Sequence, residues 1–243
     1  MYYGAFGQDM ADEFIKFHLL NPDEFWTSVP LPSIAVNDPK FRNIPGNNWS
    51  GQPQGLTFQR SIRALENYGH YAELALIGEK LLKVVGDSLK FTQQFYPFEG
   101  TANSTSDGYG PTILATLEFV SRLYGIHMTM GTIYWSNIKR STTEYYKQEW
   151  GKYTFEMKEH NGWITCYLND KDIISFTKGA RIVTDLQGNF IEIVGIDYKP
   201  VQIEVNYDKN IYSLLVEPNA IYKFNDKGEL SRWKTVAFDY SEK

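Results

Sequence analysis

The hydrophobic period of the chain changes near residue 128, and this change limits the folds that the chain can adopt. Before that point, apolar residues recur every three or four positions, as on one face of an α-helix. After it, short runs rich in β-branched and aromatic residues alternate with polar positions, as in half-buried strands. We therefore expect an α+β protein with a helical domain over residues 1–128 and an antiparallel β-sandwich over residues 129–243.

Helical periodicity predicts helices over residues 8–20, 56–68, 71–85 and 111–125. In the first of them, Met10, Phe14, Phe17 and Leu20 form the apolar face. The short connection after the second, at Gly69, implies antiparallel neighbours. This half of the chain should therefore consist of layered helical hairpins.

Alternating apolar runs predict the strands of the second half, at residues 153–159, 162–169, 171–177, 180–196, 200–207, 211–218 and 220–225. Clusters of Asn, Asp and Gly separate several of these runs, and such residues favour hairpin turns. The spacing is typical of an antiparallel sandwich that starts between residues 128 and 150.

Charge and composition exclude several classes of protein. A net charge of −5, with 24 basic and 29 acidic residues, disfavours nucleic-acid binding. The single cysteine, Cys166, excludes an intrachain disulfide and is expected to be buried in a strand. No basic and apolar leader follows Met1 and no apolar run has the length of a bilayer, so we expect neither a signal peptide nor a membrane span.

No sequence motif indicates a metal or a cofactor. The four histidines lack the spacing of zinc ligands: His18, His70, His127 and His160. The glycine patterns of phosphate-binding and dinucleotide-binding loops are missing as well. Three helical glutamates with basic neighbours are interpreted as solvated: Glu66, Glu73 and Glu79.

Two long loops, 43–55 and 93–110, carry most of the candidate functional residues. Each leads into a predicted helix, so both should lie at the same end of the helical half. They contain amides, carboxylates and aromatic rings: Asn47, Asn48, Trp49, Gln52, Gln54, Gln93, Gln94, Tyr96, Glu99, Asp107 and Tyr109. Aromatic rings can cover the C–H face of a sugar, and amides and carboxylates can bond its hydroxyl groups. The loops therefore predict an oligosaccharide or glycoside as the ligand.

A structural role explains several of these residues equally well. Trp49 could fill a gap between helices, and Gln52 and Gln54 could bond backbone groups of a Pro/Gly loop. Asp107 before a glycine suits a turn or the cap of the following helix. Glu99, also before a glycine, suits a plain turn.

Three stretches between residues 8 and 125 resemble a known enzyme family: FWTSVPLPSIAVNDPKF, NNWSGQPQGLTFQRSIRALENYGHYAEL, and QQFYPFEG followed by DGYGPTILATLEFV. They are similar to the C-terminal part of the (α/α)6-barrel glycoside hydrolases, the trehalase and processing-glucosidase-like enzymes of families 37 and 63 and their bacterial relatives. In that family, a Trp-x-Gly stretch introduces a helix with L-x-x-Y-G, as residues 49–51 and 65–69 do here. A later E-x-Y-x-P-x-x-G segment of the family corresponds to residues 93–100.

The resemblance implies hydrolysis of O-glycosidic bonds with inversion, in which one carboxylic acid protonates the leaving oxygen and one carboxylate activates water. The position of the family's base is Gln93 here, and a carboxamide cannot accept that proton. We therefore predict Glu99 and Asp107 as the candidate catalytic residues, either of which could replace the base, whereas the family's general acid is expected in a segment before residue 1. The predicted substrate-binding residues are Asn48, Trp49, Gln52, Gln54, Gln93 and Tyr109.

A complete barrel of this family has about twelve helices, and only the four helices above are expected here. The resemblance thus implies the C-terminal segment of a longer enzyme. Its exposed helical faces would need an upstream barrel half or a second copy of the chain as partner. The alternative is a non-catalytic carbohydrate-binding or protein-interaction module. Carbohydrate turnover favours a bacterial periplasmic or extracellular setting, and the residues themselves indicate no compartment.

Overall fold

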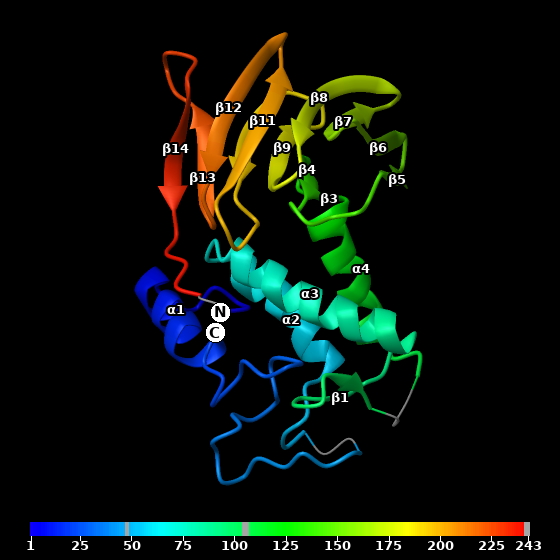
Figure 1. Cartoon of the computed structure of the whole chain (residues 1–243), viewed down its shortest axis with the longest axis vertical. Coiled ribbons are helices and arrows are strands. Elements are labelled where there is room, and N and C mark those ends of the chain that lie inside the picture. The colour runs from blue at the N-terminus through cyan, green and yellow to red at the C-terminus, as the bar shows by residue number, and fades with distance from the viewer. Residues whose placement is uncertain (47–48, 104–106, 241–243) are drawn as a thin grey trace. The chain divides into compact units, whose positions relative to one another are not determined.

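The computed structural model describes residues 1–46, 49–103 and 107–240 (Figure 1). The chain forms two compact units. One comprises Met1–Phe119 with Ala237–Lys243, and the other comprises Val120–Val236. The boundary between Phe119 and Val120 falls within a helix. The C-terminal segment that begins at Ala237 belongs to the helical unit.

The helices lie close to the predicted ranges. They are α1 at Gln8–Phe14, a π-helical continuation η1 at Ile15–Leu19, α2 at Gly55–Glu66, α3 at Tyr71–Ser88 and α4 at Gly110–Tyr124. A small antiparallel hairpin, β1 at Phe95–Tyr96 and β2 at Thr101–Ala102, precedes α4. Within the described residues, none of the helices combines the length and apolar character needed to cross a membrane.

The core of the helical unit is built mainly from α2 and α3, which lie side by side in Figure 1. On α2, Phe58, Ile62 and Leu65 are buried at the spacing of one helical face. Leu74 and Ile77 face them from α3, and both are fully buried. These buried side chains lie at the spacing of three and four residues from which the two helices were predicted.

The first helix buries part of the predicted apolar face, because Phe14 and Leu20 are partly buried and pack against the core. Met10 and Phe17 are more than half exposed, while Ala11, Ile15 and Leu19 are buried. The second part of this helix is a π-helix, whose wider turns shift side chains relative to the 3.6-residue period. The prediction was therefore wrong for Met10 and Phe17, and at Phe17 the reason is that it assumed a regular α-helix throughout.

The second unit contains two six-stranded sheets, in which every pair of neighbouring strands is antiparallel. One sheet has the order β14-β13-β10-β9-β4-β3. Its strands are β3 at Ile126–Thr129, β4 at Thr132–Asn137, β9 at Ala180–Asp185, β10 at Phe190–Val194, β13 at Ala220–Phe224 and β14 at Leu230–Thr235. The expected α+β class is confirmed.

The other sheet has the order β12-β11-β8-β7-β6-β5. Its strands are β5 at Tyr145–Trp150, β6 at Tyr153–His160, β7 at Trp163–Leu168, β8 at Lys171–Thr177, β11 at Val201–Tyr207 and β12 at Asn210–Val216. Side chains from both sheets share one core, as the ring contact of Trp135 on β4 with Phe155 on β6 shows. This arrangement is a β-sandwich. Cys166 is buried in it, as expected, and burial raises the pKa of its thiol.

Gly55, the first residue of α2, provides a test of packing in the helical unit. A Cβ atom at this position would lie 1.9 Å from Oγ1 of Thr112, whose hydroxyl donates to the carbonyl of Thr92. We expect Gly55→Ala to lower the free energy of unfolding by about 1–3 kcal/mol, the usual cost of overpacking.

The matched control is Gly86→Ala near the end of α3, where an added Cβ meets no atom within 4 Å. That variant should be neutral or more stable by up to about 1 kcal/mol, because alanine reduces the entropy of the unfolded chain. Calorimetric unfolding of both variants measures the difference. Equal stability of the two variants would contradict the close approach at Gly55.

Candidate functional site

The two candidate loops are joined through their backbones. Gln54 and Gln94 form an isolated antiparallel bridge. The N–H of Gly55 donates to the carbonyl of Gln93 at 2.9 Å, and the N–H of Phe95 donates to the carbonyl of Pro53 at 3.1 Å. Segments that are far apart in the sequence therefore lie side by side, each leading into a regular element of the helical unit.

A layer of buried amide side chains reinforces this junction. Gln52, Gln54 and Gln94 have no solvent-exposed surface. The side-chain amide of Gln52 donates to Oδ1 of Asn43 at 2.9 Å, and its carbonyl oxygen accepts from the side-chain amide of Asn103. In this structure Gln52 and Gln54 therefore hold the loops in position instead of facing solvent.

This amide layer also has unused hydrogen-bonding capacity. The side-chain oxygen of Gln54 and both side-chain polar atoms of Gln94 have no partner in the part of the chain that the structure describes. Leaving a buried polar group unpaired costs about 1–3 kcal/mol. A polar ligand that reached these groups would recover part of that free energy.

We give the name loop surface to six accessible residues of the two loops: Trp49, Gln93, Phe98, Glu99, Asp107 and Tyr109. Trp49 is 44 % exposed and its backbone has a φ of +56°. A bulky residue in this left-handed region is strained, and such strain is typical of functional sites. The predicted binding residue Asn48 lies outside the described residues.

Asp107 holds its own loop together. Its Oδ1 accepts the backbone N–H of Phe91 at 2.9 Å and that of Gly108 at 2.8 Å. These two hydrogen bonds favour the ionised carboxylate and lower the pKa of Asp107 below its ordinary value. A carboxylate in this state can accept a proton or stabilise positive charge, whereas a general acid near neutral pH needs a raised pKa.

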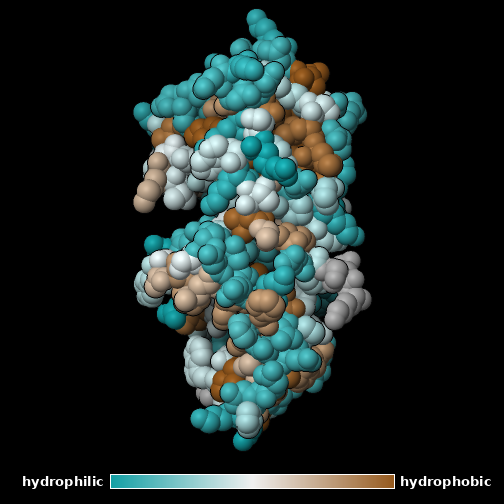
Figure 2. Space-filling model, turned by 90° about the vertical axis from the view of Figure 1, so that its left-hand side faces the viewer, coloured by the Kyte–Doolittle hydropathy of each residue, from teal (hydrophilic) through white to brown (hydrophobic). Residues whose placement is uncertain are grey.

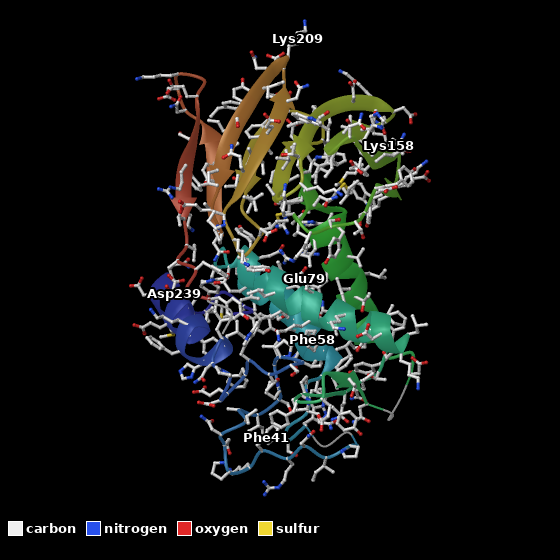
Figure 3. All side chains as sticks on the ribbon, viewed as in Figure 1. Phe41, Phe58, Glu79, Lys158, Lys209 and Asp239 are labelled. Atoms are coloured by element: carbon white, nitrogen blue, oxygen red, sulfur yellow. The ribbon has the colours of Figure 1, made fainter. Side chains whose placement is uncertain are left out.

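An aromatic pair extends the loop surface, and the sequence analysis did not single it out. The rings of Phe41 and Phe98 meet edge to face, with their centroids 6.0 Å apart. Phe98 is 49 % exposed. Figure 3 labels Phe41 at the loop end of the helical unit, with Asp239 of the same unit at a different end. Phe41 and Phe98 are far apart in the sequence, so the contact between their rings was not predicted. The position of Phe98 beside the candidate Glu99 was a signal that this ring could belong to the site.

A second polar cluster of the helical unit was also missed. Glu73, interpreted from the sequence as solvated, is only 1 % exposed, so that prediction was wrong. It lies beside His70, which also contacts Asp12. These three residues line a hollow of about 280 Å³ together with Lys16, Asp239 and several apolar side chains. Helical charge spacing could not reveal the cluster because its two acids come from helices distant in the sequence.

Comparison with protein-family models and with curated proteins gave no match. The resemblance to glycoside hydrolases therefore depends only on the stretches quoted above. Among the described residues, no group of three or more His, Cys, Asp or Glu side chains is arranged to hold a metal ion.

The low pKa of Asp107 predicts how its loop responds to acid. Because this pKa is depressed in the folded chain, the carboxylate contributes stability above its unfolded pKa, and that contribution is lost as pH falls through the folded value. We expect the backbone amides of Phe91 and Gly108 to lose exchange protection over that acidic range, as measured by NMR. The response should vanish in Asp107→Asn.

Asp87→Asn is the control for this titration, because the exposed Asp87 carboxylate pairs with Lys83 and bonds neither backbone amide. This variant should retain the response of wild type. An unchanged titration of the Phe91 amide in Asp107→Asn would show that another group causes it.

Proposed function

We propose that this chain binds an oligosaccharide or glycoside on the loop surface, as the C-terminal segment of an inverting glycoside hydrolase. The observation that supports this proposal best is the junction of the two loops by backbone bonds and buried amides. This junction supports a surface with the exposed Trp49 and Phe98 rings and the Glu99 carboxylate. A preorganised surface loses little conformational entropy when a ligand binds.

The chemistry of the loop surface suits a neutral, hydroxyl-rich ligand. An exposed indole such as that of Trp49 presents a flat apolar face, which complements the C–H side of a pyranose ring. Gln93 and Tyr109, both partly exposed, can donate to and accept from hydroxyl groups. Selectivity for a sugar would come from the combination of ring stacking with these polar contacts.

Hydrolysis is the more demanding part of the proposal. Inversion needs one protonated and one ionised carboxyl group on opposite sides of the bond that breaks. The two hydrogen bonds to Asp107 suit the ionised role. Glu99 is exposed and is our other candidate for the ionised role, and the protonated carboxyl group would come from the upstream barrel half. Gln93 would then orient water or a sugar hydroxyl, because its amide cannot act as the base.

Exposed leucines on α4 support the expectation of a partner chain. Leu114 and Leu117 lie about one turn apart within the helical unit, and both are more than half exposed. On the face shown in Figure 2, hydrophobic residues form separate patches among hydrophilic ones. We propose that an upstream barrel half or a second copy of the chain covers these leucines.

Trp49→Ala tests the binding site directly. We expect the dissociation constant for α-glucosides, with trehalose and maltotriose as probes, to rise at least about tenfold, or 1.4 kcal/mol, in isothermal titration calorimetry. The control is Trp150→Ala in the sandwich, where the ring is 57 % exposed, and this variant should bind as wild type does. Loss of binding in the control alone would place the site on the sandwich.

Turnover tests the catalytic part separately. If the chain hydrolyses an α-glucoside, NMR of the first product should show the inverted anomer, and Glu99→Gln or Asp107→Asn should abolish the reaction without abolishing binding. Binding without turnover would favour the non-catalytic module. An absence of binding to any probe would contradict the proposal as a whole.

A further inference from the structure

His70 is enclosed between two carboxylates from different helices. It precedes α3 as the N-cap residue and is 1 % exposed. Its Nδ1 lies 2.9 Å from Oε1 of Glu73 in the first turn of α3. Its Nε2 lies 2.9 Å from Oδ1 of Asp12 on α1. We call Asp12, His70 and Glu73 the His70 clasp.

This geometry favours a protonated ring, because each ring nitrogen lies within hydrogen-bonding distance of a carboxyl group. A neutral imidazole carries one N–H, so it can donate to only one of two ionised carboxylates. The imidazolium form donates to both, and its bonds to the carboxylates are charge-assisted. Burial by itself lowers the pKa of His70, but the hydrogen bonds and charges of Glu73 and Asp12 outweigh that effect and raise it above the ordinary value.

The clasp connects the N-terminal helical segment to the rest of its unit. Asp12 also accepts a hydrogen bond from Nε2 of Gln8, which in turn donates to the carbonyl of Tyr68. Ile15 and Leu19 of the same segment belong to the hydrophobic core formed with α2 and α3. The polar contacts at Asp12 therefore lie beside the apolar contacts that hold α1 and η1.

Three other charged groups line the hollow beside the clasp. Glu13 and Lys16 line it from α1 and η1, and Asp239 lines it from the chain end. Lys16 Nζ lies 2.9 Å from Oδ2 of Asp239, which Figure 3 labels beside α1. With a neutral His70, the carboxylates of Asp12 and Glu73 would face each other across the ring without its positive charge. The Asp12 side chain is 32 % exposed, so water reaches the clasp from the side of Asp12.

We propose that His70 acts as a proton-dependent clasp: when protonated it fixes α1 and η1 to the start of α3, and loss of the proton releases that segment by local unfolding. The direction of the pH effect follows from the raised pKa of His70. A group with a raised pKa in the folded state contributes stability fully below its unfolded pKa, and that contribution is lost as pH rises through the folded value. The segment should therefore open on the alkaline side.

Hydrogen exchange of the full chain, followed by mass spectrometry and corrected for the intrinsic pH dependence of exchange, tests the clasp. We expect the protection of residues 8–19 to fall about tenfold for each unit by which the pKa of His70 is raised, while residues 71–85 of α3 stay protected. The midpoint should match the His70 titration measured by NMR. Protection of residues 8–19 that is independent of pH would overturn the proposal.

Two variants separate the proton from the packing. His70→Gln should give low protection of residues 8–19 at every pH, whereas His18→Gln, which removes an exposed histidine paired with Glu24, should keep the wild-type response. If His70→Gln does not fold, Asp12→Asn serves instead. It removes one carboxylate charge and should move the His70 titration and the opening midpoint to lower pH together. A midpoint that does not move would contradict the clasp.

Discussion

The hydrogen bonds between residues 53–55 and 93–95 are the constraint on which the rest of the helical unit depends. They fix the start of α2 and the start of the β1–β2 hairpin with a single junction. The close approach of Gly55 to Thr112 extends that junction to the first turn of α4. In the described parts of the two loops, this junction joins segments distant in the sequence, and buried amide side chains satisfy part of the polar groups there.

The helical unit uses two kinds of polar cluster, and their chemistry differs. The amides of Gln52 and Asn103 are neutral, so their hydrogen bonds do not depend on pH. The cluster of Asp12, His70 and Glu73 is ionic and holds together through a proton. Neutral amide hydrogen bonds can therefore hold the loop surface in one conformation over a wide pH range, whereas the ionic cluster responds to a change of pH.

Strands were predicted where one face is buried and missed where the pattern is interrupted. The run from Val201 to Tyr207 alternates regularly, and β11 was expected. The edge strands β5 and β14 are mostly exposed and rich in charged residues, so no alternation marks them. The strand β4 is largely buried on both faces, and its buried residues include the polar Ser136 and Asn137, so apolar and polar residues do not alternate along it. Apolar and polar residues alternate along a strand when one of its faces is buried and the other is exposed. These three strands do not meet that condition.

The sequence by itself determined the α+β class, the helices of the core and the two loops in which the polar residues gather. The tertiary structure alone decided which of those residues are accessible, because burial depends on segments distant in the chain. Gln52 is enclosed by Asn103, and Trp49 remains exposed. His70 meets Asp12 only because α1 packs beside the start of α3. Local spacing can place a side chain on a helix face, but its partner across the fold is set only when the helices pack.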